Sequence, residues 1–429
     1  MHYCATAGAT THHAPLYRSS DKFVLAMTSA PNYPSDYKQW LAKLISFDTV
    51  SRNSNLPLVD YVKAYLKTVG VESSLVYNPA KTHANLWATL PGEGGITQGG
   101  IILSGHTDVV PVDGQKWASD PFTMVEKDGK LFGRGACDMK GFLAAVLALV
   151  PYFLSMKRAK PVHIAFSFDE EVGCRGVPFL IDFLKEKGLQ ADGCLIGEPT
   201  SMKVYTGNKG RTAWEVKVHG KAIHSSMALM NTSCNAIEYA AQIVTKVREI
   251  ALDIKKNGKQ DPLYDCPFAC ISTGVIKGGN AVNTVPAECY FTFSMRVNDS
   301  TEKERVESEV KTYISSTVLP FMREEFADAQ IELVRTADYP PFTGNDDNAL
   351  TQEARRLRAD PHQHRSGAGT EAGYFNGVLK IPSVIMGPGS IDEAHQPNEF
   401  VTVQQMDCCM DTVVGMVSTL CGMSKDSHM

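Results

Sequence analysis

The sequence predicts an α/β protein with a mixed, mostly parallel sheet that carries helices on both faces, and with a smaller α+β layer inserted into it. Short apolar strands at 100–103, 162–168 and 193–196 alternate with segments of helical period. Acidic residues follow these strands, and the pattern changes to alternating strands beyond residue 209. Mostly apolar strands between helices are typical of a sheet that is buried on both faces.

The elements of the first domain follow from hydrophobic spacing. Apolar residues recur with helical period at 37–45 and again at 58–69. The apolar run 142–154 predicts a buried helix, because about a dozen residues are too few to cross a bilayer core of roughly 30 Å.

The inserted layer has the order strand, helix, two strands, helix, strand, which suits a small α+β unit. We expect these elements near residues 214–218, 231–250, 273–276, 290–297, 302–316 and 331–334. Pro340 and Pro341 mark the return to the first domain. The predicted division is therefore 35–208 with 339–424 for the first domain and 209–338 for the insert. Residues 1–34 form an extension, for which a weak transit segment and a true start at Met27 are alternatives.

Length and composition limit the function classes. A chain of 429 residues exceeds the roughly 250–300 residues of a single core. A net charge of −5 without a long Lys/Arg run gives no footprint for a phosphate backbone, so we expect no nucleic-acid partner. Eleven cysteines, an odd number, predict reduced thiols in a cytosol-like compartment. Neither Gly-x-Ser-x-Gly nor a Walker A pattern is present.

The first candidate site pairs His106 with Asp108 just after an apolar strand. An imidazole binds divalent metals, and a carboxylate two residues on can accept its second ring proton. Alone, this pattern also fits a capped turn.

The second candidate is Asp138, in the segment 133–141 that runs into the apolar helix. Asp138 can be a metal ligand, but it can also be the N-cap of that helix or pair with Lys140.

Further carboxylates follow two other strands. Asp169, Glu170 and Glu171 end the strand 162–168, and adjacent carboxylates repel one another unless a cation offsets their charge. A solvated acidic turn is the alternative. Glu198 follows the next strand, where a surface residue would also be ordinary.

The last candidate is His395, in the Gly/Pro-rich loop 387–398. The loop fits a metal ligand or an ordinary turn. Taken together, two histidines and several carboxylates at strand or loop ends form a donor set suited to zinc or a similar divalent ion.

Five segments in order carry a resemblance to a known family: 104–110, 133–141, 169–173, 197–200 and 387–398. They resemble the metal motifs of the acetylornithine deacetylase and succinyl-diaminopimelate desuccinylase family, with its aminoacylase and carboxypeptidase relatives. The resemblance extends from about residue 35 to the C-terminus. It implies a zinc-dependent hydrolase of linear amides, an insert that serves as lid and dimerisation domain, a homodimer, and a cytoplasmic location.

The resemblance also implies a ligand set. Asp138 would bridge two Zn²⁺ ions, for which Co²⁺ or Mn²⁺ could substitute. His106 and Glu198 would complete one site, and Glu171 and His395 the other.

By the same resemblance, Glu170 is the general base, which takes a proton from water and passes it to the leaving amine. Side chains of neighbouring residues in an extended chain point in opposite directions, so Glu171 can bind metal while Glu170 faces the water. Asp108 would support His106.

Substrate contacts are implied by weaker matches. His224 resembles a histidine that reaches across the dimer to stabilise the oxyanion, although it could instead cap the following helix. Asn283 and Arg296 resemble contacts to a substrate carboxylate, which suits the bidentate geometry of arginine, although Arg296 also fits a salt bridge on a strand face. Thr370 and Glu371 lie where the family lines its substrate pocket.

Together with the resemblance, these residues imply removal of the acetyl group from an N-acetyl amino acid, first of all N-acetyl-L-ornithine in arginine biosynthesis. A desuccinylase, an N-acetylcitrulline deacetylase, a general aminoacylase and a dipeptidase share the same metal chemistry. An inactive metal-binding relative is the non-enzyme alternative, and the presence of Glu170 speaks against it. The expected partner is a small molecule, without membrane or nucleic acid.

Overall fold

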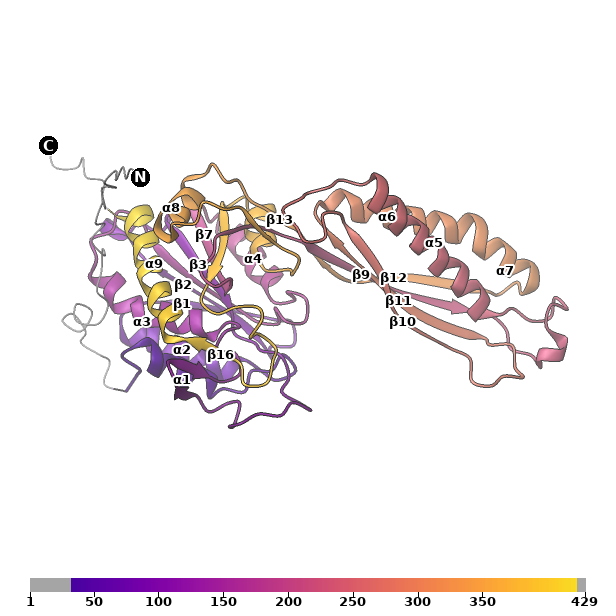
Figure 1. The fold of residues 1–429 in the computed structure, drawn as a ribbon, viewed down its shortest axis with the longest axis horizontal. Coiled ribbons are helices and arrows are strands. Elements are labelled where there is room, and N and C mark those ends of the chain that lie inside the picture. Colours follow the sequence, from indigo (N-terminus) through magenta and orange to yellow (C-terminus); the bar gives the residue numbers. More distant parts are fainter. Residues whose placement is uncertain (1–31, 423–429) are drawn as a thin grey trace, which may run out of the picture.

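The computed structural model describes residues 32–422 (Figure 1). It has two lobes, each built on its own sheet, and the second lobe extends away from the first (Figure 1). Nearly all of the expected extension 1–34 lies outside the described residues.

The first lobe is built on a nine-stranded mixed sheet. Its central strands β6, β3, β7 and β15 run parallel, whereas the pairings toward the β1 edge, and those of β8 with β15 and β13, are antiparallel. In spatial order the strands are β1 (Ser73–Tyr77), β2 (Ala84–Leu90), β6 (Val162–Ser167), β3 (Ile101–His106), β7 (Gly193–Pro199), β15 (Ser383–Gly387), β8 (Tyr205–Asn208) and β13 (Phe342–Thr343), with β14 (His364–Ser366) beside β8. The predicted mixed sheet is confirmed, with its parallel part in the centre.

Helices cover both faces of this sheet, as predicted. Because strand side chains alternate between faces, Leu103 packs into one core cluster and Ile102 into another. The first core includes α1 (Tyr37–Ile45), α2 (Leu56–Thr68), α3 (Lys140–Ser155), α8 (Ala349–Arg358) and α9 (Val403–Cys421). The second includes α4 (Val177–Glu186) and the short helix η5 (Tyr374–Val378). The apolar run at 142–154 is confirmed as part of the buried helix α3.

The second lobe contains a four-stranded antiparallel sheet. Its strands are β10 (Cys270–Gly278), β11 (Glu288–Val297), β9 (Gly210–His219) and β12 (Gln330–Tyr339), in that spatial order. One face is covered by α5 (Ala236–Asn257), α6 (Ser300–Tyr313), η4 (Ile314–Val318) and α7 (Leu319–Glu325) (Figure 1). In β11 the buried residues alternate with partly exposed ones, which explains why this sheet needs helices on only one side.

Short elements complete the chain. A small sheet, β16 (Phe400–Thr402), β5 (Lys130–Phe132) and β4 (Val125–Lys127), holds the segment after residue 399 beside the segment before residue 133. The single turns η2 (Glu93–Gly95) and η3 (Ser225–Met227) lie in loops. Within residues 32–422, no helix combines the length and the apolar character that a membrane crossing requires.

His163 gives the first lobe a predictable pH dependence. It is fully buried on β6, stacks on Trp87 with ring centroids 5.0 Å apart, and donates from Nε2 to the carbonyl of Gly99 (3.1 Å). Burial lowers the pKa of His163 to about 4. The folded protein therefore resists a proton that the unfolded chain accepts near its ordinary pKa of about 6.5, so stability present above about pH 6.5 is lost as the pH falls toward 4.

Replacing His163 by glutamine should remove this dependence. Between about pH 7.5 and about pH 5, we expect wild-type protein to lose about 2 kcal/mol of unfolding free energy more than His163→Gln loses. Urea unfolding at both pH values measures the difference, and equal losses in the two proteins would contradict the assignment.

Candidate metal centre

The carboxyl ends of three parallel strands meet at one edge of the first sheet. β3 pairs with β6 on one side and with β7 on the other. His106 ends β3, Glu198 lies at the end of β7, and Glu170 and Glu171 follow β6 by a few residues. Side chains from separate parts of the sequence are thereby collected at this edge, as expected for functional groups of open α/β sheets.

Asp138 lies between the two predicted histidines. Its Oδ1 is 3.0 Å from Nε2 of His106, and its Oδ2 is 3.2 Å from Nε2 of His395. Nε2 of His395 is also 3.1 Å from Oε2 of Glu171. The two oxygens of Asp138 thus face different imidazoles, which is the arrangement that a bridging carboxylate needs.

Two groups of side chains have the spacing of metal ligands. In each group the ligand atoms lie within 4.8 Å of one another. One group is His106, Asp138 and Glu171, and the other is His106, Glu170 and Glu198. We call these five residues together with His395 the metal centre. All six side chains come from the set predicted from the sequence.

Burial disfavours the negatively charged form of the crowded glutamates in the metal centre. Burial, together with neighbouring carboxylates such as Asp138, raises the pKa of Glu170 to about 8 and that of Glu171 to about 7. The pKa of Glu198 is raised well above its ordinary value for the same reasons. Oε1 of Glu171 is buried without a hydrogen-bond partner. Carboxylate oxygens and imidazole nitrogens are ligands of divalent cations, and such a cation would offset the buried negative charge of the carboxylates.

The pKa values of the two histidines are raised as well, which for an imidazole favours the charged form. Hydrogen bonds to Asp138 and Glu171 raise the pKa of His395 to about 10. Burial opposes charge on His106, but its hydrogen bond to Asp138 raises its pKa well above the ordinary value. Each imidazole therefore lies where positive charge is stabilised, which is the electrostatic condition for holding a metal ion.

Asp108 positions other residues of the metal centre through hydrogen bonds. Nδ1 of His106 donates to the backbone carbonyl of Asp108 (2.9 Å), and because a carbonyl only accepts, Nε2 is the nitrogen available to a metal. The carboxylate of Asp108 is farther from this ring, at 3.6 Å. It accepts instead from the backbone N–H groups of Glu170 (3.1 Å) and Glu171 (3.2 Å) and from the hydroxyl of Ser51 (2.7 Å). The sequence predicted that the carboxylate of Asp108 accepts the ring proton of His106, but the backbone carbonyl of Asp108 accepts it, and the carboxylate holds the segment after β6 instead.

His224 and Asn283 lie in the second lobe, apart from the metal centre. The N–H of Ser225 donates to the carbonyl of Asn283 (2.9 Å), so the loops that carry the two residues are neighbours. They lie beside η3, at the end of the second sheet that is distant from the first lobe (Figure 1). His224 is exposed, and its Nδ1 accepts from the N–H of Ser226 (3.3 Å), so it caps the single turn η3, whereas the following helix α5 is capped by Asn235.

Arg296 lies on β11 and donates from Nη1 to the hydroxyl of Tyr339, which ends β12. A Cβ atom at Gly369 would be 2.1 Å from Cε2 of Tyr339, so Tyr339 packs directly on this glycine. Burial raises the pKa of Tyr339 to about 12. Arg296 is therefore linked through Tyr339 to the segment that carries Thr370 and Glu371, a contact that sequence reasoning missed.

Thr370 and Glu371 are both buried. The hydroxyl of Thr370 donates to Oδ1 of Asn208 (3.1 Å), and Oε2 of Glu371 accepts from the hydroxyl of Ser104 (3.3 Å). Oε1 of Glu371 is buried without a hydrogen-bond partner.

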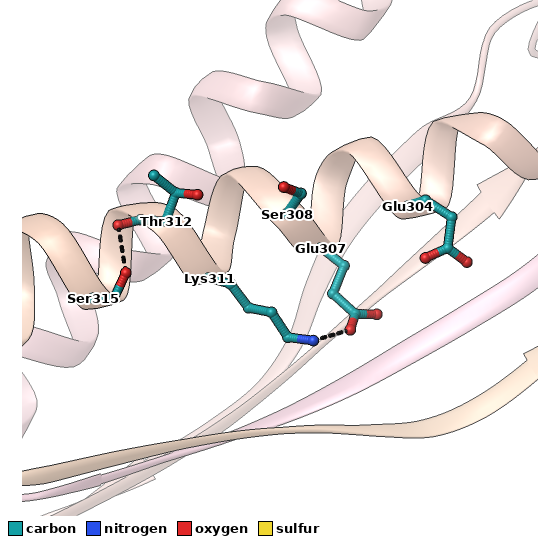
Figure 2. Close-up of a pocket in the computed structure, with 6 residues that line it drawn as sticks. All are labelled: Glu304, Glu307, Ser308, Lys311, Thr312 and Ser315. Carbon is teal, nitrogen blue, oxygen red and sulfur yellow. Dashed lines mark hydrogen bonds and ion pairs between the residues drawn. The ribbon is translucent and has the colours of Figure 1, made fainter.

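A hollow of about 560 Å³ lies away from the metal centre, on α6 and the start of η4 in the second lobe (Figure 2). It is lined by Glu304, Glu307, Ser308, Lys311, Thr312 and Ser315. Figure 2 shows hydroxyl and charged side chains along one helix face, with Lys311 paired to Glu307. This surface has the character of a solvated helix, and we assign it no ligand.

Comparison with known proteins gives relatives over nearly the whole chain. Residues 102–419 match peptidase family M20/M25/M40. An acetylornithine deacetylase of Myxococcus xanthus is 33% identical over 387 residues, which cover 89% of this chain and 97% of the relative. An acetylornithine deacetylase of Pasteurella multocida (strain Pm70) is 27% identical, with 92% of this chain and 100% of the relative covered.

Solved structures share the fold. Aminopeptidase PepT from Bacillus cereus superposes with a TM-score of 0.68 at 19% identity, covering 89% of this chain and 96% of that protein. A protein of Bacillus subtilis described as a dinuclear metal-binding peptidase of the M20 family superposes with a TM-score of 0.63 at 15% identity, covering 90% and 98%. The family match covers most of the chain, and relatives in sequence and in structure agree with it. The chain therefore belongs to peptidase family M20/M25/M40 and is a metal-dependent hydrolase.

Proposed function

We propose that this hydrolase is a two-zinc amidohydrolase that removes the acetyl group from N-acetyl-L-ornithine, giving L-ornithine and acetate. The observation that carries the reaction type is the position of Asp138 between His106 and His395, with glutamates on either side. The similarity to acetylornithine deacetylases supports the substrate. A role in arginine biosynthesis and a cytoplasmic location would follow from that substrate.

The proposed ligand set has Asp138 as the bridge. His106 and Glu198 would hold one ion, and Glu171 and His395 would hold the other, in agreement with the short distances from Asp138 to both imidazoles. Two divalent ions in these positions would make water acidic enough to act as a nucleophile near neutral pH and would polarise the amide carbonyl.

Glu170 is the proposed general base. Its backbone N–H is held by Asp108, and its carboxylate lies within ligand distance of His106 and Glu198. A carboxylate in this position can accept a proton from the attacking water and deliver it to the leaving nitrogen. The same spacing would also allow Glu170 to bind metal, so its variant must be tested for both roles.

Replacing Glu170 by glutamine should separate the two roles. We expect Glu170→Gln to retain about two metal ions per chain, while kcat falls by about 10²- to 10⁴-fold, the usual contribution of a positioned acid/base. Metal analysis and steady-state kinetics measure the two quantities. Glu353→Gln, which changes a buried glutamate paired with Arg356 in α8, is the control and should keep its activity. Loss of one metal ion in Glu170→Gln would show that Glu170 is a ligand instead.

We further propose that residues 209–338 form a lid and dimerisation domain, with residues 35–208 and 339–424 as the catalytic domain. All four strands of the second sheet lie between Gly210 and Tyr339, and that sheet has its own core. Its distant end carries exposed apolar side chains near His224, including Leu229 (79% exposed) and Val282 (103% exposed). A second copy of the chain that covers this end would place His224 at the partner's metal centre to stabilise the oxyanion.

Hybrid dimers test this arrangement. His224→Ala and Glu170→Gln chains should each be nearly inactive alone, but a hybrid would contain one complete site. After equal mixing and subunit exchange we expect about a quarter of wild-type activity, because half of the dimers are hybrids with one intact site of two. Kinetics after co-refolding measures the rescue. Activity no higher than the mean of the two separate variants would exclude action across a dimer.

Arg296 of one chain and Asn283 of the second copy, which would arrive together with His224, are the proposed contacts for the substrate carboxylate, with Thr370 and Glu371 on the substrate side of the first lobe. The guanidinium of Arg296 supports this role because it donates to Tyr339, whose ring packs on Gly369 of the first lobe. The partnerless Oε1 of Glu371 is a candidate acceptor for a substrate amine.

A substrate panel tests the proposed reaction and the role of Arg296 together. We expect N-acetyl-L-ornithine to exceed N-acetylcitrulline, N-succinyl-diaminopimelate, other N-acyl amino acids and dipeptides in kcat/KM. Arg296→Ala should lower kcat/KM for free carboxylates by about 10- to 100-fold, the value of a charge-assisted hydrogen bond, but should change amidated analogues little. Arg296→Lys, which keeps the charge without the bidentate geometry, is the matched variant. A preference for dipeptides would replace the proposed substrate, and equal losses on both substrate forms would remove Arg296 from carboxylate binding.

A further inference from the structure

Glu399 is a buried carboxylate beside the metal centre that the proposed reaction does not use. It is 1% exposed and lies four residues after His395, directly before β16. We propose that Glu399 is a positioning residue that holds the loop carrying Asp138 in its metal-binding conformation. This inference rests on the proposed ligand set, but not on the proposed substrate.

The hydrogen bonds of Glu399 converge on the Asp138 loop. Oε1 accepts from the backbone N–H groups of Cys137 (2.9 Å) and Asp138 (3.0 Å). Oε2 accepts from the backbone N–H of Gly135 (3.0 Å) and from Nη1 of Arg134 (2.7 Å). Three of the four donors are main-chain groups of one short loop, and one belongs to the proposed bridging ligand itself.

The loop needs such an acceptor because residues 133–139 form turns rather than a helix or strand. Gly135 has a φ of +81°, and a Cβ atom there would be 2.7 Å from Cγ1 of Val109, so the chain is tightly confined. Buried N–H groups without a partner cost free energy. The carboxylate of Glu399 satisfies them together, and the backbone direction at Asp138 follows from that set of bonds.

The same network fixes His395 relative to Asp138. Nη2 of Arg134 donates to Oε1 of Gln115 (2.5 Å), and Nε2 of Gln115 donates to the carbonyl of His395 (2.9 Å). Arg134 is fully buried and forms an ion pair with Glu399 (2.7 Å). Asp138 and His395, two proposed ligands from distant parts of the sequence, are therefore both connected by hydrogen bonds to the ion pair of Arg134 and Glu399.

Glutamine is the informative replacement at Glu399 because it keeps the size but turns an NH₂ group toward N–H donors. On one side of the side chain, two donors would then face a donor. The loop should lose its preferred geometry although the core remains filled. If Glu399 is a positioning residue, Glu399→Gln should weaken metal binding more than it destabilises the fold.

The test is a titration of chelator-stripped protein with Co²⁺, followed through its visible d–d absorption. We expect Glu399→Gln to bind Co²⁺ about 10- to 100-fold more weakly than wild type, the usual effect of changing a group that supports a ligand, and with an altered spectrum. Glu353→Gln is the control: it also changes a buried, ion-paired glutamate, so it should lower the melting temperature without changing Co²⁺ affinity or spectrum.

A Glu399→Gln protein with a lowered melting temperature but wild-type Co²⁺ affinity and spectrum would overturn the inference. Asp138→Asn separates this result from a wrong ligand set: wild-type Co²⁺ binding in that variant would overturn the ligand assignment itself. If Glu399→Gln does not fold, Gln115→Ala tests the network from its partly exposed end. A Co²⁺ affinity in Gln115→Ala equal to that of wild type would then refute the inference, and a several-fold loss would support it.

Discussion

The repulsion among the carboxylates that end the central parallel strands is the constraint on which the active part of the molecule depends. The order β6, β3, β7 brings Glu170, Glu171 and Glu198 around His106 in a largely buried volume. Like charges in such surroundings are unfavourable unless cations or protons offset them. The raised pKa values of the glutamates and of the histidines express one imbalance, an excess of negative charge that divalent ions can neutralise.

Two further carboxylates near the centre have a different function, and their partners distinguish them. Asp108 and Glu399 accept mainly from backbone N–H groups, whereas Asp138 and Glu171 face imidazoles. A carboxylate surrounded by main-chain donors has its charge stabilised locally and fixes the chain around it. The acidic residues near the metal centre therefore fall into two groups. Asp138 and Glu171 can bind metal ions, whereas Asp108 and Glu399 fix the conformation of loops.

The sequence was informative wherever a feature is local. Strand ends followed by acids predicted the positions of His106 and Glu198, and long periodic segments predicted α3 and α5. Strands of two or three residues, such as β13, carry no periodicity and could not be foreseen. The contacts of Tyr339 with Arg296, and of Glu399 with the Asp138 loop, join segments distant in sequence. A glutamate one position beyond the resembling segment 387–398 gave no sign of its role, because its donors are backbone atoms.

The bond between Glu399 and the N–H of Asp138 spans 261 residues, and this separation orders events during synthesis. The second lobe draws all its strands from 210–339 and can complete its sheet while the ribosome is still making β15 and α9. The first lobe begins earlier but must wait for the segment around 395–399. By the proposed ligand set, the site of His106, Asp138 and Glu198 is present in the emerging chain once residue 198 is made, whereas the site with Glu171 waits for His395, so the two ions would join the protein at different stages of its synthesis.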